Sequence, residues 1–294
     1  MTWQFSIAGL LIGALVGLTG MGGGSLMTPM LVILFGFNPT YAVGTDIVHG
    51  AIFKSFGAVR HRRLGTVHAR LTLWMFLGSG PMSLLGVWLA TLIKHHFANA
   101  SKIEGYAVGA ALVVGGLGFL AKSFINRGIQ ASDAPFLLSS RDKAIAVTIG
   151  AVFGFVVGLT SVGSGTFFGL VMVLVYPLTM AKIVGTDIFH AAALLWVAGI
   201  GHMIGHNVDY HATGWLLIGS IPGVLLSSRF TVRLPDKVLR GALGIVLLLS
   251  GLKLLNVPEA KWILLGGLIA LGCGLTAYGV LAWRARPRLQ TASS

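Results

Sequence analysis

Charge is the scarcest property of this sequence. Only 10% of its 294 residues are charged, whereas a soluble domain has about 25%. Just 8 residues are acidic and 55% are hydrophobic, so too little polar surface is available to cover a soluble globule. The 42 glycines follow no Gly-X-Y period, which excludes collagen. This composition predicts an all-α polytopic membrane protein.

The sequence is equally poor in the signatures of metal, cofactor and nucleotide chemistry. Cys273 is the single cysteine, which excludes an intrachain disulfide and a cysteine-based metal site. No G-x-x-x-x-G-K-S/T motif is present, which argues against a self-contained primary pump. Residues 1–20 lack the basic start of a removable signal peptide. Because these motifs are missing, no cofactor is expected. A nucleic-acid binder would gather its cations on a charged surface, so no nucleic-acid partner is expected either.

Long apolar runs dominate the sequence, but four of them are shorter than the roughly 20 residues that a spanning helix needs. The short runs form two pairs, each split by glycines at 20–24 and 163–165. This pattern predicts two re-entrant hairpins, which require surrounding protein or a polar cavity. Two tilted full spans with a turn outside the bilayer are the alternative. The runs cover residues 5–19, 22–37, 41–59, 71–93, 103–125, 144–160, 165–178, 183–201, 213–228, 238–256 and 261–283.

The second half of the chain repeats the first at one constant offset. Residues 9–85 set against 150–226 without a gap give 25 identities in 77 positions, which indicates duplication. Val-Gly-Thr-Asp-Ile-Val-His at 43–49 returns as Val-Gly-Thr-Asp-Ile-Phe-His at 184–190. Small-residue stripes at i, i+4 and i+8 also repeat and predict close helix packing. They consist of Gly9, Gly13 and Gly17, and of Gly150, Gly154 and Gly158.

The distribution of Lys and Arg predicts how the two repeats are oriented. The positive-inside rule places 16 of the 21 cations on the cytoplasmic side. Segment 60–70 holds four arginines, but its repeat counterpart 201–211 has no Lys or Arg. Equivalent loops of opposite charge character indicate inverted topology, which is typical of secondary transporters.

We therefore expect two inverted repeats, each a Gly-broken hairpin plus about three spanning helices, and one extra C-terminal helix. The N-terminus is expected outside and the C-terminus in the cytoplasm. The predicted units are a first membrane repeat at 1–128, a cytoplasmic linker at 129–142, a second membrane repeat at 143–257, and a C-terminal transmembrane helix with a basic tail at 258–294.

Two Asp–His pairs stand at repeated positions within or beside apolar runs. Asp46 precedes His49 by three residues, and Asp187 precedes His190 by three. Residues i and i+3 share a helix face, so each carboxylate can accept a hydrogen bond from its own imidazole. Ionisable groups in membrane helices indicate function, and these four residues are predicted to couple transport to protons. Alternatively, Thr45-Asp46 and its counterpart cap helix N-termini.

The Gly-rich breaks are predicted to bind an anion, because half-helix N-termini present free N–H groups and a positive dipole end. Lys54, which is replaced by Leu195 in the second repeat, can supply a fixed positive charge; snorkelling to the interface is its alternative role. The predicted substrate-binding residues are Gly22, Gly23, Gly24, Ser25, Thr45, Lys54, Gly163, Ser164, Gly165, Thr166 and Thr186.

One histidine cluster has metal-like spacing. His202, His206 and His211 lie near Asp209, and histidines at i and i+4 can share a metal. A solvated loop with chance histidines is the favoured explanation, and no metal site is assigned.

The motif Gly-Leu-Thr-Gly-x-Gly-Gly-Gly at 17–24, followed by Pro29 and Val43-Gly44-Thr45, resembles the sulfite exporter TauE/SafE (TSUP) family. The resemblance runs from about residue 5 to residue 255. It implies a bacterial inner-membrane transporter for sulfur-containing anions such as sulfite, thiosulfate or organosulfonates. The second copy departs from the motif at Ser161 and Ser164, which suggests an asymmetric site.

The functional hypothesis is a proton-coupled secondary transporter of such an anion, with alternating access at a midplane site between the hairpins. One alternative is a divalent cation transporter that uses the two Asp–His pairs as ligands. Another is an integral-membrane enzyme with Asp–His acid/base catalysis, although no nucleophile or cofactor motif accompanies the pairs, and no enzymatic activity is expected. The expected partners are the anion, protons and membrane lipid, and a homodimer is compatible with the sequence.

Overall fold

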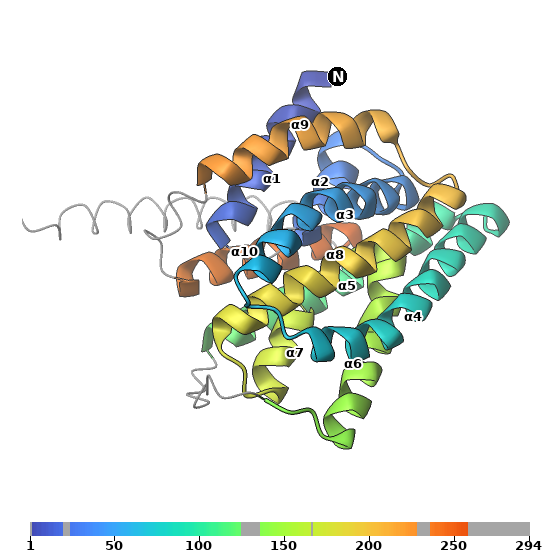
Figure 1. Ribbon diagram of the computed structural model, residues 1–294. Helices are drawn as coiled ribbons and strands as arrows, with labels where there is room; N and C mark the ends of the chain where they lie inside the picture. Colours follow the sequence, from blue (N-terminus) through green and yellow to red (C-terminus); the bar gives the residue numbers. More distant parts are fainter. Residues whose placement is uncertain (1, 20–23, 125–135, 166, 228–235, 258–294) are drawn as a thin grey trace, which may run out of the picture.

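The computed structural model describes residues 2–19, 24–124, 136–165, 167–227 and 236–257. In these ranges the protein has ten helices and no strands, which confirms the all-α class (Figure 1). The first half contains α1 (Thr2–Thr19), α2 (Gly24–Phe35), α3 (Pro39–Arg63), α4 (Ala69–His96) and α5 (Ala100–Phe124). The second half contains α6 (Ser140–Thr160), α7 (Phe167–Val175), α8 (Met180–Ile204), α9 (Tyr210–Ser227) and α10 (Asp236–Leu254).

Four of the described helices are long and apolar enough to cross a membrane. The candidate spans are Ala69–His96, Ala100–Ala121, Ser140–Thr160 and Met180–Ile204. Shorter apolar stretches occur in α1, α2, α9 and α10. Because a helix satisfies its own backbone hydrogen bonds in lipid, this set of helices makes the chain a multi-pass membrane protein.

The two helices that follow the Gly-rich breaks are short. The α2 helix has 12 residues and α7 has 9, so α7 is only about 14 Å long at 1.5 Å per residue. The α6 helix, by contrast, has 21 residues, and the prediction that it is half-length was wrong. A capping box starts α6 before its apolar run, because Ser139 Oγ accepts from the Asp142 N–H and the Asp142 carboxylate accepts from the Ser139 N–H.

The first helix of each half packs against the fourth helix of the other half. A Cβ atom at Gly9 of α1 would lie 2.3 Å from the carbonyl oxygen of Leu216 in α9. A Cβ atom at Gly150 of α6 would lie 2.1 Å from the carbonyl oxygen of Met75 in α4. Gly150 is the repeat counterpart of Gly9, and Leu216 is the repeat counterpart of Met75. The glycine stripes therefore bring backbones together as predicted, and the two interfaces are reciprocal.

The third helix of each half, α3 and α8, lie side by side and run antiparallel (Figure 1). A Cβ atom at Gly199 would lie 3.4 Å from Val48, and one at Gly57 would lie 3.1 Å from Ile188. Trp196 Nε1 donates a hydrogen bond of 2.9 Å to Ser55 Oγ. Because positions 55 and 196 are repeat counterparts, equivalent residues meet each other at this interface.

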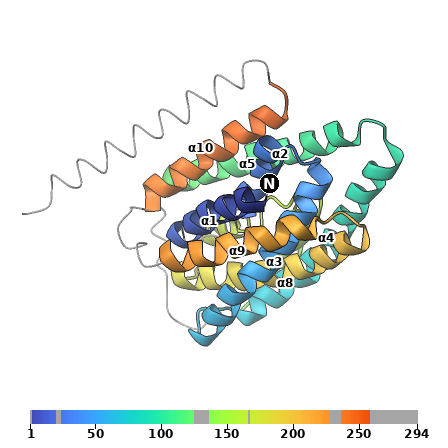
Figure 2. The same cartoon turned by 90° about the horizontal axis from the view of Figure 1, so that it is seen from above.

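The fifth helices, α5 and α10, also pack through glycines and lie beside each other in Figure 2. A Cβ atom at Gly109 would lie 3.0 Å from the carbonyl oxygen of Gly251, and one at Gly116 would lie 2.7 Å from that of Gly244. Gly109 and Gly244 are counterparts in this contact, as are Gly116 and Gly251, so the contact is reciprocal. The offset between these counterparts is shorter than the offset that relates the earlier helices. The ungapped repeat extends only to residue 226 and does not relate this pair, because the spacing between the helices is shorter in the second half.

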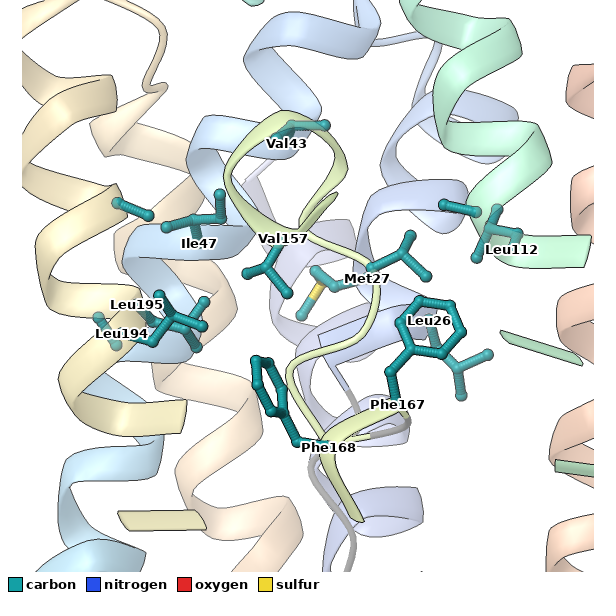
Figure 3. Close-up of a cluster of buried hydrophobic side chains, with 14 of the residues drawn as sticks. Leu26, Met27, Val43, Ile47, Leu112, Val157, Phe167, Phe168, Leu194 and Leu195 are labelled. Carbon is teal, nitrogen blue, oxygen red and sulfur yellow. The ribbon is translucent and has the colours of Figure 1, made fainter. Parts of the chain in front are cut away.

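Apolar side chains from both halves form one buried cluster in the interior. Met27 of α2 and Phe168 of α7 are completely buried, and Figure 3 shows both in the same cluster as Val157 of α6 and Ile47 of α3. The two short helices therefore contribute to the core that surrounds the polar residues of α3 and α8.

Several predicted segments lie outside the described residues. They are the C-terminal helix at 261–283 with its basic tail, residues 129–135 of the linker, and the basic segment at 228–235.

The reciprocal glycine contacts give a direct test of this packing. We expect Gly154→Ala to lower the melting temperature by several degrees, because its Cβ would lie 2.5 Å from the Ser79 Cα and such overpacking costs about 1–3 kcal/mol. Gly214→Ala in α9 is the matched control, since no atom lies within 4 Å of its added Cβ. Thermal unfolding in detergent measures both variants, and equal melting temperatures would contradict the proposed contact.

Candidate functional site

Asp46 lies at the centre of a polar network that joins the two halves. The side chain is 1% exposed, and its Oδ2 accepts three hydrogen bonds. Thr28 of α2 donates through its N–H at 3.2 Å and its Oγ1 at 2.6 Å, and Ser161 donates through Oγ at 2.8 Å. Ser161 follows α6 in the left-handed conformation, with φ of 61°. One carboxylate oxygen thus ties α3 to α2 and to the break of the second half.

The interpretation of Asp46 as a helix cap was wrong. Asn38 caps α3 by accepting from the Thr40 N–H, so Asp46 lies about two turns inside the helix. Thr179 likewise caps α8, ahead of Asp187. Both helices begin before the apolar runs that the sequence analysis used to place their starts.

The threonines that precede the two aspartates orient the fourth helices. Thr45 Oγ1 accepts from the Asp209 N–H at 3.0 Å, directly before α9. Thr186 Oγ1 accepts from the His68 N–H at 2.9 Å, directly before α4. These two contacts are repeat counterparts, so each threonine binds the start of a helix from the other half.

The histidines of the Asp–His pairs also bond across the halves. His49 Nε2 lies 2.9 Å from Ser220 Oγ, and His190 Nε2 lies 2.9 Å from Ser79 Oγ, each sharing a hydrogen bond. The predicted hydrogen bond from His49 to Asp46 is not formed: Asp46 Oδ2 accepts from Thr28 and Ser161, Asp46 Oδ1 has no partner among the described residues, and His49 Nε2 bonds with Ser220. A spacing of three residues on one helix therefore did not pair the two side chains.

Two buried polar atoms of this network have no hydrogen-bond partner within the described ranges. They are Asp46 Oδ1 and His190 Nδ1. Buried polar atoms are normally paired, so both atoms are available for a ligand or a proton.

Lys54 is the buried cation of the site. It is 5% exposed, and its Nζ donates to the carbonyl oxygen of Ser164 and, at 3.0 Å, to Ser164 Oγ. It lies within electrostatic range of both Asp46 and Asp187. The snorkelling alternative was wrong, because the ammonium group lies in the interior between the two halves and not at the interface.

The break after α6 is a tight turn that directs Ser164 toward Lys54. Gly163 has φ of 115° and Gly165 has φ of 130°, values that favour glycine. The Gly165 N–H donates to the Gly163 carbonyl oxygen at 2.8 Å, and the Phe167 N–H donates to the same atom at 3.3 Å. The Gly165 amide, one of those predicted to bind an anion, is therefore used within the turn.

The remaining predicted binding residues belong to the break of the first half, except Thr166, which belongs to that of the second half. Gly24 and Ser25 form the first turn of α2. Gly22, Gly23 and Thr166 lie outside the described residues.

The structure separates the histidines of the predicted metal-like cluster. His202 belongs to α8, is completely buried, and bonds through Nε2 to the Gly158 carbonyl oxygen at 2.9 Å. His211 Nε2 accepts from Trp215 Nε1 at 3.1 Å, and Asp209 Oδ1 accepts from the Ala212 N–H at 2.9 Å. Among the residues that the structure describes, no group of three or more His, Cys, Asp or Glu side chains is arranged to hold a metal ion.

Four hydroxyl residues of the site were not predicted as binding residues. Ser79 and Ser220 are identical in the two repeats, so their repetition was a usable signal. Thr28 and Ser161 gave no such signal, because Gly169 and Gly20 stand at their counterpart positions.

A buried polar set between two interlocked helical halves of a multi-pass protein is typical of a membrane transporter. The sequence profile of the family "Sulfite exporter TauE/SafE" matches residues 5–254, and the chain belongs to this family. It is 38% identical over 255 residues to the "Probable membrane transporter protein YjnA" of Bacillus subtilis (strain 168), covering 87% of this chain and 100% of that protein.

Two further relatives are more distant. The "Probable membrane transporter protein YdhB" of the same organism is 26% identical, over 83% of this chain and 96% of its own length. The "Probable membrane transporter protein MJ0441" of Methanocaldococcus jannaschii is 24% identical, over 79% and 85% respectively. No solved structure matches the chain. The resemblance inferred from the glycine motif is thus confirmed, and this protein is a membrane transporter of the TauE/SafE family.

Proposed function

We propose that the protein is a secondary transporter of a small sulfur-containing anion in the bacterial inner membrane. The observation that carries the proposal is the burial of Lys54 between the two halves, bound to Ser164 in the break of the second half. A fixed cation is expensive at membrane depth. An anionic substrate that binds beside Lys54 offsets the free-energy cost of burying this cation, so sulfite, thiosulfate or an organosulfonate suits the site.

The antiparallel arrangement of α3 and α8 supports inverted topology. These helices are repeat counterparts, and counterparts that cross a bilayer in opposite directions are related by an axis in the membrane plane. Inverted repeats exchange roles when a transporter alternates between its outward-open and inward-open states. The reciprocal His–Ser bonds, His49 to Ser220 and His190 to Ser79, are contacts that such an exchange would break and remake.

The proposed orientation follows the charge of the loops. Segment 60–70, with its four arginines, faces the cytoplasm under the positive-inside rule. Its counterpart at 201–211, which has no Lys or Arg, then faces outside, and the C-terminus lies in the cytoplasm.

Proton coupling is assigned to Asp46, His49, Asp187 and His190. All four side chains are buried in α3 and α8. Asp46 Oδ1 and His190 Nδ1 can each take or release a proton without losing the bonds to Thr28, Ser161 or Ser79. Proton binding near Lys54 would change the local charge, and this links protonation to anion affinity.

The divalent cation alternative has no support from the geometry. The described residues contain no set of three metal-ligating side chains, and Lys54 would repel a divalent cation in the same site.

Transport in vesicles tests this function. We expect purified protein in liposomes to move labelled sulfite, and a gradient of one pH unit, which supplies about 1.4 kcal/mol per coupled proton, should increase the initial rate several-fold. A protonophore in the same vesicles is the matched control and should remove the increase. Sulfite flux equal to that of protein-free liposomes would contradict the substrate class, whereas flux that ignores the gradient would contradict the coupling alone.

A further inference from the structure

The C-terminal part of α3 and the facing surface of α8 form a cavity of about 540 Å³ that the proposed transport site does not use. It is open to the surroundings at the end of α3 that carries the arginines. The residues that line it are Ser55, Ala58, Val59, Arg62 and Arg63 of α3 and Phe189 of α8.

The wall of the cavity is almost wholly apolar, and the exposed residues Arg62 and Arg63 border it. The Arg62 guanidinium lies over the Phe189 ring, 5.9 Å from its centroid, and Arg63 stands next to it. Neither arginine is paired with a carboxylate within the described part of the chain, and segment 60–70 has no acidic residue. The cavity therefore lacks the negative charge that would balance its two guanidinium groups.

The surface beside the cavity is suited to lipid. Phe56 is 67% exposed, Val59 is 52% exposed and Leu64 is 61% exposed, so the end of α3 presents large apolar side chains outward. In a multi-pass membrane protein such a surface contacts acyl chains. A ligand that fits here has an anionic group for the arginines and a hydrocarbon chain for the wall.

We propose that this cavity binds an anionic phospholipid. The phosphate lies between Arg62 and Arg63, whose guanidinium groups form bidentate hydrogen bonds with phosphate oxygens. The first part of an acyl chain lies along Ala58, Val59 and Phe189. Basic pockets at the ends of membrane helices recognise lipid headgroups in this manner. A free oxyanion would leave the apolar wall uncovered, and for that reason the lipid is the better fit.

Binding of phosphatidylglycerol to the delipidated, full-length protein tests the proposal. We expect dioleoylphosphatidylglycerol to raise the melting temperature in neutral detergent, whereas dioleoylphosphatidylcholine raises it much less. Arg62→Gln/Arg63→Gln should increase the half-maximal lipid concentration about tenfold, as expected for the loss of charge-assisted hydrogen bonds. Arg60→Gln/Arg70→Gln is the matched control, because it removes two charges from the same segment without touching the cavity, and it should keep the wild-type response.

Several results would overturn the proposed lipid site. An equal response to both lipids, or an equal loss in the two double variants, would overturn the proposal in favour of general membrane attraction. Competition by millimolar sulfate would overturn it in favour of a soluble anion site. If Arg62→Gln/Arg63→Gln does not fold, Arg62→Lys/Arg63→Lys keeps the charge and removes the bidentate geometry. Native mass spectrometry should then detect fewer retained phosphatidylglycerol molecules on it than on the wild type, and an unchanged number would overturn the proposal.

Discussion

Lys54→Leu is expected to reduce anion transport about a hundredfold while the protein stays folded. The substitution removes the buried cation and its charge-assisted hydrogen bonds, which contribute about 1.5–3 kcal/mol each. Leucine is tolerated in this environment, because Leu195 occupies the counterpart position and is 1% exposed. Initial rates of labelled sulfite uptake into liposomes measure the effect, and the melting temperature reports folding.

Two further variants test whether the effect of Lys54→Leu depends on the position of the positive charge. Lys102→Leu removes a charge from the exposed surface of α5 and should leave the rate unchanged. Lys54→Leu/Leu195→Lys moves the cation to the counterpart position across the α3–α8 interface, where Leu195 Cδ1 would lie 3.0 Å from a Cβ atom added at Gly50. We expect this double variant to regain part of the transport. A normal rate in Lys54→Leu would refute a role for this lysine in anion binding.

Asp46→Ala is expected to destabilise the protein strongly, whereas Asp46→Asn is expected to fold and to lose proton coupling. Alanine leaves three donors of Thr28 and Ser161 without an acceptor in the interior, and each unsatisfied group costs about 1–3 kcal/mol. Asparagine can keep these bonds through its side-chain oxygen. Its NH₂ group then takes the position of Asp46 Oδ1, an atom that has no partner among the described residues. The asparagine cannot ionise, so its sulfite flux should no longer respond to a pH gradient.

Removing the donors together with the acceptor separates the structural role of Asp46 from its charge. Thr28→Val/Ser161→Ala should raise the melting temperature of Asp46→Ala, because replacing both partners of a buried hydrogen bond costs less than replacing one. Thermal unfolding of the two variants measures this coupling. Independent, additive effects would show that the three hydrogen bonds do not hold the network together.

Much of the fold was accessible from the sequence because duplication leaves a direct record. The identities at one constant offset located the first four helices of each half, and the glycine stripes predicted interfaces that the structure confirms at Gly9 and Gly150. The fifth helices were missed as a pair, because their counterpart glycines follow a shorter offset. The α6 helix was taken as too short, since the polar residues of its capping box, Ser139 and Asp142, lie outside the apolar run.

The residues of the site were partly predictable, but their partners were not. Repetition drew attention to Asp46, His49, Asp187 and His190, and the rarity of charge drew attention to Lys54. Local spacing then suggested that each histidine bonds the aspartate of its own helix. The structure instead pairs His49 with Ser220, 171 residues away. The packing of α3 against the other half of the chain brings this hydroxyl group to the imidazole, and local spacing along one helix cannot predict such a contact.

Composition, repetition and glycine spacing are properties of the chain, so they were enough to establish a membrane protein with a duplicated helical unit and a TauE/SafE motif. The use of the scarce charges, in contrast, became visible only in the folded protein. The tertiary structure buried Lys54 against Ser164 and placed Thr28 and Ser161 on Asp46, because α3 packs against α2 and against the break of the second half. The site is asymmetric because counterpart positions carry different side chains, as at Lys54 and Leu195, which the sequence already indicated.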